Sequence, residues 1–181
     1  MKFERKWNFH PLGVALAMFA ASFVLSTVPL KAQGKEKEIG GGWSVLDQSF
    51  SNGEHSCLAS IITENTLFKF VIGSRGSFYI AIADVPLINQ LKSVGLWTAG
   101  AEYRAQVFIG KDAPYATEGQ QYGDHTVMVR VPYSAVPRFS RADRVAINLN
   151  GLAMRGFRVP GMKRGLDAVI GCAKRNNLIA R

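Results

Sequence analysis

Cysteine, histidine and acidic side chains are all scarce in this chain of 181 residues. It contains two cysteines and three histidines, and its 13 Asp and Glu residues are outnumbered by 22 Lys and Arg. Two cysteines are too few for a disulfide-framework miniprotein or a four-cysteine zinc site. A single long apolar run excludes a polytopic membrane protein, and 48% apolar residues exclude wholesale disorder. The length is typical of one domain.

The first 32 residues have the pattern of an export signal. Lys2, Arg5 and Lys6 precede an apolar run over 12–30, and a small residue, Ala32, lies at its polar exit. A basic start, an apolar centre and a small exit residue are typical of a cleaved signal peptide. An uncleaved membrane anchor is the alternative, because 19 apolar residues can span a bilayer. Both interpretations place the rest of the chain outside the cytoplasm, in the periplasm or secreted.

Positive charge is concentrated in the last third of the chain. Residues 33–129 contain 7 basic and 10 acidic side chains, whereas residues 130–181 contain 11 basic and 2 acidic ones. Such a basic region favours contact with an anionic partner: an envelope polymer, a lipid headgroup or an acidic protein. A solvated basic face that aids solubility is the alternative. Nucleic acid is not expected as a partner of an exported chain, and a membrane is expected only if the signal segment remains attached.

Cys57 and Cys172 both remain after cleavage and face an oxidising compartment. An even pair there is predicted to form one disulfide, which joins an early strand to the last helix. Two free buried thiols or a nucleophilic cysteine are the alternatives. A catalytic thiol needs a partner that lowers its pKa, and no such partner is evident in the sequence.

The remaining pattern predicts a mainly β protein. Residues 33–42 are polar and rich in glycine, so a flexible linker is expected there, followed by a single β-rich domain over 43–181. Short segments with period-two alternation or bounding turns predict strands: 57–62, 67–72, 77–83, 103–109, 126–131, 145–149 and 154–159. Apolar residues at helical spacing from Met162 to Ala173 predict one C-terminal helix. We therefore expect an antiparallel β-sandwich or curled sheet of about seven to eight strands, closed by that helix.

Residues suited to catalysis are few. His55 and His125 are the only histidines left after cleavage, next to Glu54 and Asp124 respectively. Neighbours in an extended segment point to opposite faces, so neither pair predicts a catalytic set. Two histidines without ligand spacing make no metal site. No catalytic residue, metal or cofactor is therefore predicted, and a hydrolase that uses His55 or His125 is the least favoured of the function classes.

Two surface features are candidate binding sites. The segment 110–124 is predicted to be a long loop, and its Tyr115 and Tyr122 are suited to recognition of a protein or a sugar. An ordinary loop whose tyrosines pack on the sheet is the alternative. Arg138, Arg141 and Arg144 are spaced by three, so a short helical turn would present them on one side to carboxylates or phosphates. A solvated face, with Asp143 paired to one of the arginines, is the alternative.

The order of these features resembles a known family. The export signal is followed by Trp43-Ser44-Val45, an early Cys57, the strand 103–109 and a late Gly151-Leu152 to Gly156-Phe157 stretch before the helix. This order is similar to that of small periplasmic proteins of the invasion-associated locus B type. That family tends to carry a cysteine where this chain has Asp47. The resemblance implies a non-enzymatic envelope protein linked to host interaction or stress survival, without catalytic residues.

The sequence thus predicts an exported, non-enzymatic binding protein that acts through surface recognition on a disulfide-tied β scaffold. The expected partner is an unknown protein or an anionic envelope polymer. A periplasmic inhibitor or immunity protein that blocks a hydrolase with the 110–124 loop is the alternative function.

Overall fold

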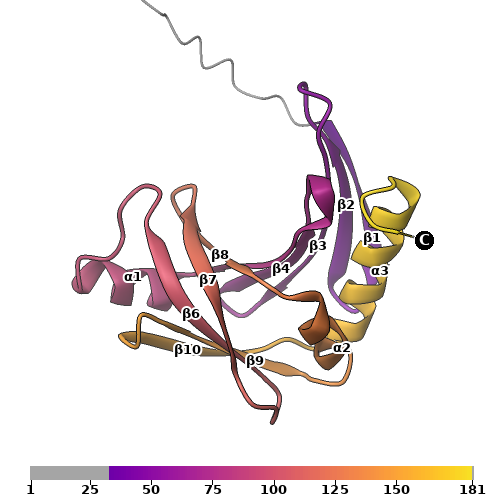
Figure 1. Ribbon diagram of the computed structural model, residues 1–181. Coiled ribbons are helices and arrows are strands. Elements are labelled where there is room, and N and C mark those ends of the chain that lie inside the picture. Colours follow the sequence, from indigo (N-terminus) through magenta and orange to yellow (C-terminus); the bar gives the residue numbers. More distant parts are fainter. Residues whose placement is uncertain (1–32, 181) are drawn as a thin grey trace, which may run out of the picture.

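A single antiparallel sheet of ten strands forms the framework of the protein (Figure 1). The computed structural model describes residues 33–180, so the signal segment 1–32 lies outside the described residues. The spatial order is β1-β2-β3-β4-β5-β8-β7-β6-β9-β10. The strands are β1 (Gln33–Gly40), β2 (Trp43–Ser49), β3 (His55–Thr63), β4 (Thr66–Ile72), β5 (Phe78–Asp84), β6 (Glu102–Ile109), β7 (Tyr115–Tyr122), β8 (Thr126–Arg130), β9 (Arg144–Leu149) and β10 (Ala153–Arg158).

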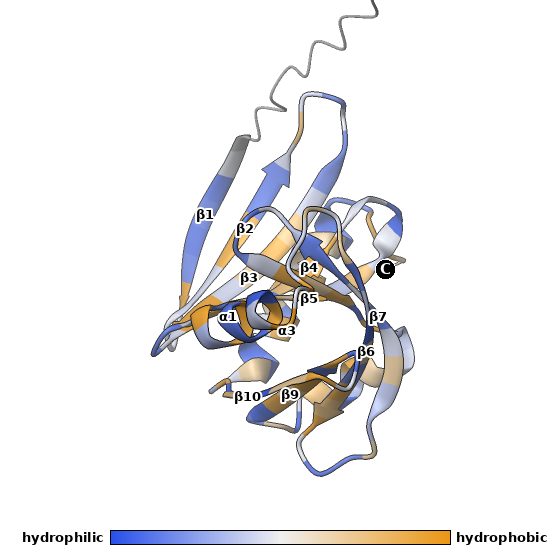
Figure 2. Cartoon of the chain, turned by 90° about the vertical axis from the view of Figure 1, so that its left-hand side faces the viewer, coloured by the Kyte–Doolittle hydropathy of each residue, from blue (hydrophilic) through white to orange (hydrophobic). Residues whose placement is uncertain are grey.

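The sheet curls on itself around one core. In Figure 2, β9 and β10 lie opposite β4 and β5, and β6 and β7 form the bend between them. Inward positions alternate with outward ones along each strand, as in β4, where Phe68, Phe70 and Ile72 are buried and Leu67, Lys69 and Val71 are half-buried on the opposite face. This confirms the mainly-β class. The sheet is continuous, so the curled-sheet alternative is the one observed, with more strands than expected.

The predicted C-terminal helix is present as α3 (Met162–Arg175) and packs on β2, β3 and β4. Trp43, at the start of β2, lies against it and is fully buried. The Trp43 ring stacks on Phe70 with centroids 5.7 Å apart, and its Nε1 donates a hydrogen bond to the Pro160 carbonyl oxygen at 2.9 Å. Gly165 of α3 faces this ring, and a Cβ there would lie 2.4 Å from a Trp43 ring carbon. A glycine is therefore needed for this close approach of helix and sheet.

The predicted disulfide is confirmed. Cys57 of β3 and Cys172 of α3 are bonded with their Cα atoms 5.9 Å apart, and both are fully buried. Beside them the Asn176 side-chain amide donates a hydrogen bond to Asp47 Oδ2 at 2.8 Å and another to the Cys172 carbonyl oxygen at 3.2 Å. The covalent bond and these hydrogen bonds hold the end of α3 on the first half of the sheet.

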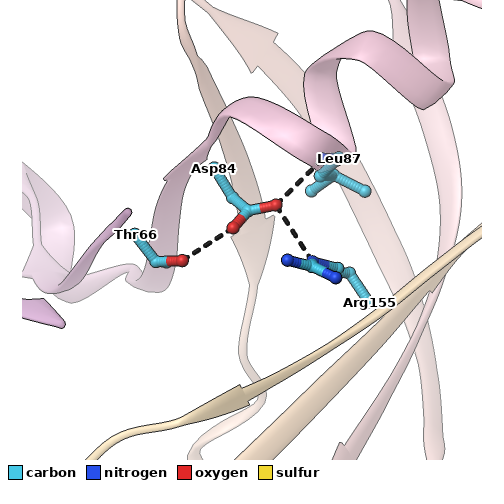
Figure 3. A network of polar contacts seen from close by, with 4 residues as sticks. All are labelled: Thr66, Asp84, Leu87 and Arg155. Carbon is cyan, nitrogen blue, oxygen red and sulfur yellow. Dashed lines mark hydrogen bonds and ion pairs between the residues drawn. The ribbon is translucent and has the colours of Figure 1, made fainter. Parts of the chain in front are cut away.

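A helix that the sequence pattern did not predict, α1 (Val85–Ser93), follows β5 directly. Asp84 caps its N-terminus by accepting a hydrogen bond from the Leu87 backbone N–H at 2.9 Å (Figure 3). The same buried carboxylate accepts hydrogen bonds from Thr66 Oγ1 at 2.6 Å and from Arg155 Nε of β10 at 3.2 Å. Asp84 therefore connects β4, α1 and β10, which belong to opposite sides of the curl.

The remaining helix is α2 (Val136–Phe139), a single turn after the short 3₁₀ segment η2 (Tyr133–Ala135); a second such segment, η1 (Ser74–Gly76), precedes β5. None of the helices within residues 33–180 is long and apolar enough to span a membrane.

The expected flexible linker over 33–42 is wrong for most of its length. Residues 33–40 form the edge strand β1, which pairs with β2 from Gln33 opposite Ser49 to Glu38 opposite Ser44 (Figure 2). Most β1 side chains are exposed, which accounts for the polar composition that indicated a linker. Charged residues are common on edge strands because they discourage further strand pairing. A Gly-rich turn joins β1 to Trp43, with positive φ at Gly40, Gly41 and Gly42.

The expected long loop over 110–124 is also wrong. Residues 115–122 form β7, which is hydrogen-bonded to β6 on one side and to β8 on the other. Its inward positions include Thr117, Gly119 and Gln121, so the apolar alternation that marks the other strands is missing. Pairing on both edges makes this segment a strand despite its polar composition.

We predict that Gly165→Ala lowers the free energy of unfolding by about 1–3 kcal/mol, because the new methyl group collides with the Trp43 ring. Gly171→Ala, on the same helix, is the control. Its Cβ would meet only Arg175 Nη1 at 3.6 Å, so helix propensity should raise stability by about 0.5–1 kcal/mol. Urea denaturation followed by circular dichroism measures both. Equal effects of the two substitutions would contradict the packing argument.

We also predict that the Cys57→Ala/Cys172→Ala variant is less stable by about 4 kcal/mol, because the bond closes a loop of 115 residues. The buried sulfur atoms should resist reduction of the native protein and react only when urea opens the fold. Intact mass after alkylation, with and without prior reduction in urea, tests the bond itself. Two alkylatable thiols in the unreduced protein in urea would disprove it.

Candidate functional site

The outer face of the sheet, which points away from the core, carries a shallow hollow of about 420 Å³ over β6, β9 and β10. Its floor is one cross-strand row in which Phe108 pairs with Ala146 and Ala146 pairs with Gly156. Ala146 and Gly156 are small residues, and the space above them forms the hollow. Arg144 and Arg158 line it from the next row. We call this site the basic hollow.

Arg144 and Arg158 are directly opposite each other on β9 and β10. Both are exposed, and within residues 33–180 neither forms an ion pair or a side-chain hydrogen bond. Like charges at directly opposite positions of an antiparallel pair repel and destabilise the sheet. An anion bound between the two guanidinium groups would replace this repulsion with attraction and receive charge-assisted hydrogen bonds from both.

Arg155, on the same strand as Arg158, has a different environment. Its side chain points to the inner side of the curl, where its Nε lies 3.2 Å from Oδ1 of the buried Asp84 (Figure 3). Residues 155 and 158 differ by an odd number of positions, so strand alternation directs them to opposite faces. One arginine of β10 is therefore part of the internal polar network, and the other is available at the surface.

The three arginines predicted to share a helical turn lie in three different parts of the chain. Arg138 belongs to α2, which ends at Phe139. It donates a hydrogen bond to the Ala113 carbonyl oxygen at 3.0 Å and lies 3.8 Å from Asp112 Oδ2. Arg141 follows in a turn and is exposed, and Arg144 is on β9. Of this set, only Arg144 lines the basic hollow.

Tyr115 and Tyr122 do not come together either. They lie at opposite ends of β7 and on opposite faces of the sheet. Tyr115 points inward, and its hydroxyl is buried without a hydrogen-bond partner. Burial raises the pKa of Tyr115 well above its ordinary value, although the charge of Arg138 acts in the opposite direction. Tyr122 is 60% exposed at the end of the strand, so it alone is available for recognition.

The histidines lie apart from the basic hollow. His55 begins β3, and its Nδ1 lies 3.2 Å from the hydroxyl of Ser49, its register partner on β2. His125 is exposed in the turn before β8. Asp47, Cys57 and Cys172 come close together, but the two sulfur atoms are bonded to each other and are not available as thiolate ligands.

Sequence reasoning missed Arg158, the partner of Arg144. The Asn150-Gly151 pair does indicate a hairpin between the two strands, but the observed loop has three residues, since Leu149 pairs with Ala153. A two-residue loop, which this dipeptide favours, would shift the register by one position and turn Arg158 to the other face. The site therefore depends on a loop length that the dipeptide does not specify.

No protein-family model, no curated protein and no solved structure matches this chain. The candidate site consequently rests on the geometry of its own residues.

We predict that Arg158→Gln leaves the free energy of unfolding unchanged or raises it by about 0.2–1 kcal/mol, because it removes the repulsion with Arg144. The control, Arg155→Gln on the same strand, should lower it by about 1–2 kcal/mol through loss of the charge-assisted hydrogen bond to Asp84. Thermal and urea denaturation measure both variants. A loss of stability in Arg158→Gln as large as in Arg155→Gln would show that Arg158 has a structural role.

Proposed function

We propose that this protein is an exported, non-enzymatic binding protein that recognises an anionic polymer of the cell envelope through the basic hollow. One observation carries the proposal: two exposed arginines face each other at the rim of a hollow, and neither has an acidic partner among residues 33–180. Two arginines directly opposite each other do not stabilise the fold. A carboxylate or phosphate bound between them would explain the arrangement, because it would receive charge-assisted hydrogen bonds from both.

The charge distribution along the chain supports an anionic ligand. The region 130–181, with 11 basic and 2 acidic side chains, includes β9 and β10. The field of this region attracts a polyanion before contact is made. The buried disulfide supports an oxidising location, either periplasmic or secreted. The similarity to invasion-associated locus B proteins, which are envelope proteins, remains a prediction; it is compatible with a ligand in the envelope.

The alternative of an inhibitor that inserts the segment 110–124 into a hydrolase is less well supported. Residues 115–122 are held in the sheet on both sides, which leaves 110–114 and the turn residues 123–124 exposed. Arg138 binds the Ala113 carbonyl oxygen within the first of these segments. The geometry favours the basic hollow over this segment as the binding site.

We predict that the mature protein binds poly-L-glutamate and that Arg144→Gln/Arg158→Gln weakens this binding about tenfold or more, because two charge-assisted contacts are lost. Affinity should fall as salt rises from about 0.01 M to about 0.15 M, where the Debye length shortens from about 30 Å to about 8 Å. Isothermal titration calorimetry measures both effects.

The control for this experiment is Lys92→Gln/Lys174→Gln, which removes the same charge from exposed positions on α1 and α3. It should reduce affinity much less than the arginine variant. Equal losses in both variants would show that binding depends on net charge alone and would contradict a site at the basic hollow.

A further inference from the structure

The basic hollow continues into a polar surface on the outer face of the same sheet. A depression of about 460 Å³ over β5, β8, β7 and β6 is lined by polar and aromatic side chains that include Tyr79, Arg104, Glu118, Gln120, Arg130 and Asn150. A neighbouring depression of about 600 Å³ shares Arg104 and Asn150 with it and adds Gln106 and Asn148. We call the two together the polar track.

The polar track adjoins the basic hollow through consecutive cross-strand rows. Gln106 pairs with Asn148, and the next outward row on the same two strands is Phe108 with Ala146, which is the floor of the hollow. Along β9, Arg144 and Asn148 are four residues apart, about 13 Å at the rise of a strand. An extended ligand bound at Arg144 therefore lies within reach of the track.

The charged groups of the track are balanced in sign and unpaired. Arg104 is directly opposite Glu118 in the register of β6 and β7, and Glu102 and Arg130 also line the depression. Within the described part of the chain none of these four side chains forms an ion pair. The Asn148 Oδ1 atom is shielded from solvent and accepts no hydrogen bond. The four exposed charged side chains of the track thus present free donors and free acceptors side by side.

This mixture of groups selects one ligand chemistry. A hydroxyl group both donates and accepts hydrogen bonds, so a polyhydroxylated ligand satisfies amides, carboxylates and guanidinium groups together. The half-exposed ring of Tyr79 offers an apolar surface for the C–H face of a sugar ring. An acidic polypeptide would engage the arginines but would supply few hydroxyl groups to the amides and carboxylates of the track.

We propose that the ligand of the basic hollow is an acidic polysaccharide. Its carboxylate or phosphate group lies between Arg144 and Arg158, and its sugar hydroxyls bind along the polar track. This inference rests on the proposed function, because it names the class of polymer that carries the anion.

The test compares oligogalacturonate, which has a carboxylate on each sugar ring, with poly-L-glutamate of matched charge and length. The variant Gln106→Ala/Gln120→Ala removes two exposed, neutral hydrogen-bonding groups from the track and leaves every charge in place. We expect it to weaken oligogalacturonate binding about tenfold, as the loss of two neutral hydrogen bonds allows, and to leave poly-L-glutamate binding unchanged. Gln48→Ala/Asn89→Ala, on β2 and α1, is the control and should change neither affinity.

The outcomes separate this inference from the function on which it rests. The inference is supported if the wild type binds oligogalacturonate more tightly than poly-L-glutamate and the track variant loses this difference. Equal affinity for both polymers and no effect of the track variant would overturn the inference. If binding still depended on Arg144 and Arg158, that result would support the anion site and favour an acidic protein as its ligand. Failure of the wild type to bind either polymer would overturn both proposals.

Discussion

The contact between Trp43 and α3 joins the two ends of the described chain, and the shape of the curled sheet depends on it. Trp43 begins the second strand, stacks on Phe70 and donates a hydrogen bond to Pro160, just before α3. Gly165 allows the helix to approach the ring closely. The disulfide between Cys57 and Cys172 fixes the other end of the same helix. With α3 held at both ends, the inner face of β2, β3 and β4 is covered by the helix.

Strand alternation in β10 links the stability of the fold to its proposed binding site. Arg155 points inward to the buried Asp84, which also caps α1, whereas Arg158 points outward to face Arg144. The inward contact holds the last hairpin against the opposite side of the curl. Within residues 33–180 the outward pair has no ion-pair partner, which is the basis of the proposed anion site. A single strand thus contributes to the internal polar network and to the surface proposed to bind an anion.

The accuracy of sequence-based expectations followed the strength of the hydrophobic pattern. The segments 77–83 and 103–109 alternate with a period of two and were predicted as strands, and the amphipathic C-terminal helix was predicted too. The edge strand β1 and the interior strand β7 lack that alternation, because edge residues are exposed and the inward residues of β7 after Tyr115 are small or polar. Both were expected to be irregular. Their conformation is imposed by hydrogen bonding to neighbouring strands, which a pattern within one segment does not reveal.

The sequence by itself determined the mainly-β class, the closing helix and the cysteine pair, since these follow from local periodicity and from residue counts. It also located the excess of basic residues in the last third. Only the tertiary structure decided which arginines meet. Arg138 donates a hydrogen bond to the Ala113 carbonyl oxygen, and Arg155 pairs with the buried carboxylate of Asp84. Arg144 and Arg158 lie directly opposite each other. These partners are determined by the register of β9 and β10 across their three-residue loop and by the curl of the sheet. Both arise from contacts between different segments of the chain.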